Sequence, residues 1–106
     1  RITDDIIVAT GDNHKCYNNV VIAKAADTML AMAGIEATFV VARTSHSTVN
    51  ISSRSHNAIN VQRIMEKLGG GGHFNLAACQ LRDCSVSQAQ NKLIETIMGE
   101  LAPKED

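Results

Sequence analysis

The sequence predicts an α/β domain: a mixed sheet of about four strands, including one antiparallel hairpin, flanked by about three helices. Short apolar, β-branched runs alternate along the chain with stretches whose apolar residues recur at helical spacing. Two of the strand-like runs are separated by only a few polar residues, which is typical of a hairpin. The chain has 106 residues, 44% hydrophobic and 20% charged, which is the size and composition of one ordinary globular domain.

Three segments in the first half of the chain predict strands. Residues 5–10 form a short apolar run that ends at Gly11. Residues 35–43 and 47–54 follow as two strands joined by a short turn, and they make up the predicted hairpin. In the second of these strands, one face is formed by Val49, Ile51 and Ser53 and the other by Asn50, Ser52 and Arg54.

Three segments predict helices. Residues 17–33 have helical spacing, and Gly34 is expected to cap the end. The expected apolar face consists of Val21, Ala25, Thr28 or Met29, and Met32, and it is widened by Ile22, Ala26 and Ala33. A short helix follows, with Asn60 as its N-cap and with the stripe Val61, Ile64, Met65 and Leu68. The last helix runs from Ser85, which opens a capping box with Gln88, through the apolar stripe Val86, Ala89, Leu93, Ile97 and Leu101 to Pro103.

Four consecutive glycines, at 69–72, separate the second helix from a region without clear periodicity. Residues 73–78 are rich in small side chains and are expected to form a further helical turn. A brief strand over residues 79–82 is expected to follow it.

Composition and charge exclude several classes of protein. Ten Lys and Arg residues against eleven Asp and Glu leave a net charge of −1, which argues against non-specific binding to long nucleic acids. No apolar run approaches a membrane span and no secretion signal opens the chain, so we expect a cytoplasmic domain without direct membrane contact. The three cysteines contain no Cys-x-x-Cys pair and are expected to be small buried groups. Because the chain starts at Arg1 rather than methionine, it is expected to be a piece of a longer protein.

The glycine run is the first candidate for a site. Glycines let the backbone approach a ligand closely, and successive N–H groups can converge on an anion, above all where a helix begins just beyond them. Gly70, Gly71 and Gly72 are therefore predicted to form a phosphate cradle, with His73 donating a hydrogen bond at its end. The alternative is a flexible hinge between two helices.

Arg54 is the second candidate, because it stands at the end of a predicted strand and ligands collect at strand ends in α/β sheets. Its guanidinium fork suits a phosphate, and Ser53 and Ser55 are short hydroxyl donors beside it. The alternative is a solvated residue at a sheet edge. No well-spaced set of metal ligands and no nucleophile signature is present, so we expect a phosphate binder with no catalytic or metal-binding residues of its own.

The motif Leu68-Gly-Gly-Gly-Gly-His73, followed by Ala77-Ala78, resembles the Gly-Gly-Gly-His signature of the C-terminal associated domain of the DHH phosphoesterase family. The stretches at 23–30, 34–40, 51–55 and 59–62 strengthen the match, most of all to cyclic-di-AMP phosphodiesterases of the GdpP type. One departure is that three residues rather than two separate the histidine from the Ala-Ala pair, with Cys79 where a glycine is common. The cyclic-di-AMP branch tolerates this form.

The resemblance implies a division of labour within a longer protein. A catalytic domain, N-terminal to this one, would hold a pair of divalent metal ions, usually manganese, that activate water. In the domain at hand, Arg54 and His73 would contact phosphate, Gly70 to Gly72 would let the backbone approach, and Asn60 or Ser55 would touch sugar or base.

The leading hypothesis is therefore the substrate-binding domain of a metal-dependent cyclic-di-AMP phosphodiesterase. The parent protein would be anchored in the membrane through another segment, with this domain facing the cytoplasm. The domain could form a homodimer. One alternative is the clamp domain of a short-oligonucleotide or single-strand exonuclease of the same family. The other is a non-catalytic regulatory module.

Overall fold

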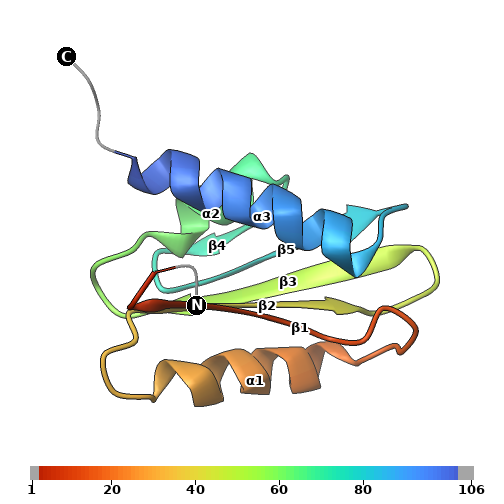
Figure 1. The fold of residues 1–106 in the computed structure, drawn as a ribbon, viewed down its shortest axis with the longest axis horizontal. Coiled ribbons are helices and arrows are strands. Elements are labelled where there is room, and N and C mark those ends of the chain that lie inside the picture. Colours follow the sequence, from red (N-terminus) through yellow and green to blue (C-terminus); the bar gives the residue numbers. More distant parts are fainter. Residues whose placement is uncertain (1–2, 103–106) are drawn as a thin grey trace.

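The computed structural model of the chain describes residues 3–102, which form a five-stranded sheet with helices on both faces (Figure 1). The elements follow one another as β1 (Ile6–Thr10), α1 (Asn19–Leu30), β2 (Ala37–Arg43), β3 (Thr48–Ser55), α2 (Val61–Lys67), β4 (Gly71–His73), β5 (Leu76–Arg82) and α3 (Val86–Leu101). The predicted α/β class with three helices is confirmed, with five strands in place of about four.

The sheet is mixed, with the strand order β1-β2-β3-β5-β4. β1 and β2 are parallel, and α1 forms the crossover that a parallel pair requires. The other neighbours are antiparallel, so the predicted hairpin of β2 and β3 is confirmed. β1 and β4 lie at the two edges of the sheet.

The helices divide between the two faces (Figure 1). α1 packs on β2 and β3, whereas α2 and α3 lie on the opposite face, α2 over β4 and β5 and α3 over β1 and β2. The main core lies under α2 and α3 and contains Phe39, Val41, Ile51, Ile64 and Leu93, all fully buried. A second, smaller cluster lies under α1.

β2 is buried on both sides, because alternate residues face the two helix layers. Phe39 and Val41 join the main core, while Val40 and Ala42 pack against α1. The buried Thr38 hydroxyl donates a hydrogen bond of 2.8 Å to the carbonyl oxygen of Ala26, which fastens α1 to the sheet.

The ends of α2 and α3 confirm the caps predicted from sequence. The Asn60 side chain accepts a hydrogen bond from the backbone N–H of Arg63, and Ser85 forms both bonds of a capping box with Gln88. Leu101 is half-exposed instead of buried, and the predicted stop at Pro103 lies outside the described residues. Among residues 3–102, no helix is long and apolar enough to cross a membrane.

α1 differs from its prediction at both ends, and it buries the flank of the predicted apolar face, Ile22 and Ala26, more than its centre. The helix ends at Leu30, so Gly34, although its φ is +79°, lies beyond the end of the helix instead of capping it. Only Ile22 and Ala26 are fully buried, whereas Val21 and Met32 are half-exposed. The contact with the sheet therefore runs along a narrower line than the sequence pattern indicates.

The largest correction concerns residues 69–82. The predicted helical turn at 73–78 is wrong: Gly71–His73 and Leu76–Arg82 are two antiparallel strands joined by a tight turn at Phe74 and Asn75. Glycines are poor strand formers, so their sequence carries no strand signal. The strand forms because the glycine backbone can lie unusually close to β5. A Cβ on Gly70 would be only 2.5 Å from the Cβ of Cys79, so a larger residue would not fit there.

Candidate functional site

On the face of the sheet that carries α1, the surface of β5 and β4 is left uncovered. α1 packs on β2 and β3 and stops there, while α2 and α3 lie behind β4 and β5 (Figure 1). Residues of β5 consequently alternate between buried and open, with Ala77 and Cys79 in the core and their neighbours exposed. We call this surface the open face. It comprises Ser52, Arg54, Gly71, His73, Leu76, Ala78, Gln80 and Arg82.

The strand register brings two of the predicted phosphate ligands into one row. Arg54 lies opposite Leu76, and Leu76 lies opposite His73. Directly opposed residues of neighbouring strands point to the same face, so all three side chains belong to the open face. With strands 4.7–4.9 Å apart, the Cα atoms of Arg54 and His73 are about 10 Å from each other. The row thus holds a guanidinium and an imidazole on either side of an exposed leucine.

The Arg54 side chain is held in place by two hydrogen bonds. Its Nε donates to Oδ1 of Asp27 in α1 at 2.8 Å, and its Nη1 donates to the carbonyl oxygen of Ser53 at 2.8 Å. A guanidinium has five N–H donors, so three remain for a ligand. The Asp27 side chain is 61% exposed and that of Arg54 only 12%, so solvent weakens the ion pair from the Asp27 side and the pair acts mainly to orient the fork.

His73 is exposed, and its side chain has no hydrogen-bond or ion-pair partner within residues 3–102. The imidazole is therefore available as a donor at the edge of the sheet. It is placed there by β4, which the hydrogen bonds to β5 hold next to the core.

The four glycines serve different purposes. Gly69 has a φ of +88°, and Gly72 has a φ of +146° and lies so close to β5 that a Cβ would be 2.6 Å from the Cα of Ala77. Gly70 is equally tight against β5. At Gly71, by contrast, a Cβ would meet nothing within 4 Å, and the position faces outward beside Ala78 and Ser52 on the open face. Local structure therefore explains three of the glycines and leaves Gly71 unexplained.

The helix expected just beyond the glycines is wrong, whereas the contact of Gly70, Gly71 and Gly72 with phosphate stays a prediction. No helix begins after His73, because the chain turns back as β5. The alternative of a hinge between two helices is wrong for the same reason. A ligand would meet the flat side of the sheet and its glycine edge strand.

Ser55 and Asn60 lie away from the row. Ser55 is 5% exposed on the opposite face, where its hydroxyl donates to the carbonyl oxygen of Phe74 at 3.2 Å and fastens the β4–β5 turn. Asn60 caps α2. Both side chains have structural partners, and their contact with sugar or base stays a prediction.

Sequence reasoning missed three residues of this region. Asp27, Leu76 and Gln80 line or support the open face, and the alternation of exposed residues along β5 would have indicated the last two if residues 76–82 had been recognised as a strand. It also missed Arg43, whose guanidinium makes five hydrogen bonds, two of them to Asn13, and ties together loops at the opposite end of β2.

Metal binding has no support in the described part of the chain, where no group of three His, Cys, Asp or Glu residues could hold an ion. Cys79 is buried, as expected, and burial raises the pKa of its thiol to about 11, so it is unreactive at neutral pH. Cys16 is exposed, so the expectation of three buried thiols is wrong there.

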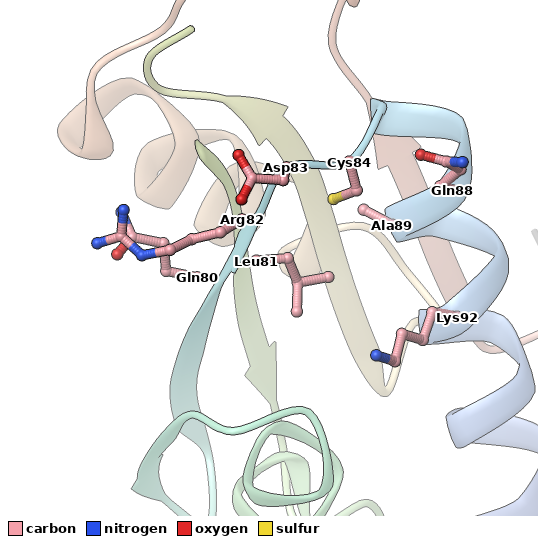
Figure 2. Close-up of a pocket in the computed structure, with 8 residues that line it drawn as sticks. All are labelled: Gln80, Leu81, Arg82, Asp83, Cys84, Gln88, Ala89 and Lys92. Carbon is pink, nitrogen blue, oxygen red and sulfur yellow. The ribbon is translucent and has the colours of Figure 1, made fainter. Parts of the chain in front are cut away.

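A hollow of about 480 Å³ lies at the far end of β5, on the side of the sheet that carries α3 (Figure 2). β4 pairs only with Leu76–Ala78, so beyond that point the outer edge of β5 has no neighbouring strand within residues 3–102. The hollow lies between this edge and α3 (Figure 2), and its walls include Gln80, Cys84, Ala89 and Lys92. Arg54 and His73 do not line it, so the phosphate candidates lie on an open surface.

Comparison with known proteins agrees with this architecture. The family model of the DHHA1 domain matches residues 4–102. The cyclic-di-AMP phosphodiesterase PdeA of Listeria monocytogenes is 47% identical over 94 residues, which are 89% of this chain and 14% of that protein. The cyclic-di-AMP phosphodiesterase GdpP of Bacillus subtilis is 46% identical over 96 residues, 89% of this chain and 15% of that protein. The chain thus spans about a seventh of the length of these relatives.

A solved structure has the same fold. The pGpG-specific phosphodiesterase PggH from Vibrio cholerae superposes with a TM-score of 0.59 over 94% of this chain and 34% of that one. The sequence identity is 12%, so this likeness concerns the arrangement of the strands and helices alone.

Proposed function

Because the chain belongs to the DHHA1 domain family, we propose that its open face binds the phosphate groups of a dinucleotide, with cyclic di-AMP as the first candidate. The observation that carries the proposal is the row Arg54–Leu76–His73. It places on one face of the sheet, about two strand spacings apart, a guanidinium with two of its N–H groups bonded and an exposed imidazole that has no partner among residues 3–102; the Arg54 side chain itself is 12% exposed.

The absence of a side chain at Gly71 also favours a dinucleotide ligand on the open face. Since neither its backbone nor its surroundings require glycine, the missing side chain leaves room for something outside the fold. It lies one row from Arg54 and His73, where a phosphate or ribose held by those residues would touch the backbone. Charge-assisted hydrogen bonds from Arg54 would then supply most of the affinity.

Hydrolysis belongs, on this proposal, to a separate catalytic domain. The two phosphodiesterases named above are about seven times longer than the matched segment, which leaves ample chain for such a domain. A divalent metal pair there, with manganese as the expected ion, would activate the water. The open face would hold the phosphodiester on the side opposite to that metal pair. We expect the domain to act in the cytoplasm.

The proposal is tested by calorimetric titration of the 106-residue chain with cyclic di-AMP and with its linear product pApA. His73→Ala and Arg54→Ala should each weaken binding by about tenfold or more, because each removes a hydrogen bond to a charged group. Arg63→Ala is the matched control: it removes the same charge from α2, on the opposite face, and should leave binding unchanged. Equal effects of all three substitutions would contradict the proposal.

Competition separates the remaining candidates. Poor displacement of cyclic di-AMP by oligonucleotides of five or more bases supports the dinucleotide, as does the scarcity of aromatic side chains for stacking. Preferential binding of the longer strands would favour an exonuclease clamp. Absence of nucleotide binding would leave the regulatory module.

A further inference from the structure

The open face continues along β5 past the phosphate row. Because side chains alternate, Leu76, Ala78, Gln80 and Arg82 all belong to it, and Figure 2 shows Gln80 and Arg82 extending from one side of β5 and Leu81 from the other. At 3.3 Å per residue, Gln80 lies about 13 Å along the strand from Leu76. That is about the reach of one nucleotide from its phosphate to the far edge of its base.

The floor between the two positions is flat. The intervening row consists of Ser52, Ala78 and Gly71, whose side chains are small or absent. A planar ring can therefore lie on this part of the sheet without meeting a bulky side chain.

Gln80 is the free amide at the end of this floor. Its neighbour on β3, Asn50, is engaged, because its Nδ2 donates to Oδ1 of Asn19 at 2.6 Å and its Oδ1 accepts from Thr44. The side chain of Gln80 is exposed and has no partner within residues 3–102. Gln80 borders the hollow at the free edge of β5, but its side chain extends from the other side of the strand, away from Leu81, Ala89 and Lys92 (Figure 2).

We propose that Gln80 is the residue that reads the nucleobase of the bound dinucleotide. The proposal rests on the function proposed above, since Arg54 and His73 fix where the phosphate lies. A glutamine amide presents one donor and one acceptor side by side, which matches the adjacent amino group and ring nitrogen of adenine. The base lies over Ala78 and its edge faces Gln80. Guanine presents two acceptors on the corresponding edge and fits an amide less well.

The test compares ligands with and without a base by NMR titration of the 106-residue chain. Gln80→Ala should weaken binding of pApA by about 5- to 100-fold, the range for loss of a bidentate base contact. It should leave binding of ribose 5-phosphate unchanged, whereas His73→Ala should weaken both ligands. Gln62→Ala, which removes a glutamine from α2 on the opposite face, is the control and should change neither.

A gain of function completes the test. Gln80→Arg should shift preference from pApA towards pGpG, because arginine pairs with the O6 and N7 acceptors of guanine. If Gln80→Ala binds pApA as the wild type does while His73→Ala does not, base reading by Gln80 is overturned and the phosphate site stands. If His73→Ala binds both ligands normally, the phosphate site is overturned first.

Discussion

Gly71 and Gly72 are neighbours in β4, yet the structure gives them different reasons to be glycine. Gly72 has a φ of +146° and lies against the backbone of β5, so folding itself requires it. Gly71 has open space where a side chain would be, on the face that we propose for the ligand. The glycine run thus combines a packing requirement with room for a binding partner.

This difference predicts opposite effects of the same substitution. Gly71→Ala should change the free energy of unfolding by less than about 1 kcal/mol while weakening dinucleotide binding several-fold. Gly72→Ala should lower the free energy of unfolding by about 2 kcal/mol or more, through strain and overlap with β5. Urea denaturation and ligand titration of both variants measure the two quantities. Unchanged binding by a well-folded Gly71→Ala variant would remove the reason given for this glycine.

The role of Asn60, as a helix cap or as a ligand contact, can be decided by measuring stability and dinucleotide affinity separately. As the N-cap of α2 its side chain accepts a hydrogen bond, so Asn60→Ala should cost about 1 kcal/mol of stability. Asn60→Asp keeps the cap and should restore stability. Unchanged dinucleotide affinity in both variants would show that Asn60 acts only as a cap. Loss of affinity in a stable Asn60→Asp variant would instead assign Asn60 a direct contact with the ligand.

At the scale of single elements, the N-caps of α2 and α3 and the apolar stripe of α2 were predictable, whereas the C-cap of α1 and the β4–β5 hairpin were not. Asn60, Ser85 and the stripe of α2 are local signals that act within one turn of helix, so the sequence alone contains them. Residues 71–73 are glycines and a histidine, which have no strand propensity. Only packing against β5 makes them a strand.

α2 and α3 are joined by a small charged cluster. Glu100 of α3 lies 2.7 Å from Nε of Arg63 and 2.6 Å from Nζ of Lys67, both in α2. Its pKa is lowered from the ordinary value of 4.5, first by the hydrogen bond from Lys67 and further by the charge of Arg63. The ionised carboxylate is therefore favoured in the folded state.

The lowered pKa predicts a pH dependence with a definite sign. The contribution of Glu100 to stability is present above pH 4.5 and is lost as the pH falls through its lower folded-state pKa. Glu100→Gln should therefore reduce the free energy of unfolding by at most about 1 kcal/mol at pH 7, because the pair is near the surface. Denaturation curves of the two proteins should converge at lower pH. A difference that grows on acidification would contradict the assignment.

At the scale of the whole molecule, the proposed site exists because the single helix α1 covers only part of its face of the sheet. It packs on β2 and β3 through Ile22 and Ala26, and the outer strands β5 and β4 stay open on that face. Sequence reasoning identified Arg54 and His73 singly, but their meeting in one row depends on the pairing of β3, β5 and β4. That pairing is a long-range property, and the local pattern around residues 69–78 points elsewhere.

An open face also fits a domain that binds a substrate for another domain to cleave. A surface without walls leaves the ligand accessible from the far side, where a catalytic domain would close over it.

The central claim, that the open face is the dinucleotide site, is tested most directly by mapping the ligand onto the chain. Cyclic di-AMP is added to the ¹⁵N-labelled 106-residue protein, and amide and arginine Nε–H shifts are followed by NMR to millimolar ligand. The account predicts saturable changes that are largest for residues 71–73, for 76–80 and for the Nε–H of Arg54, with little change in α2 and α3. Largest changes in α2, α3 or the loops around Arg43, or no change at all, would contradict it.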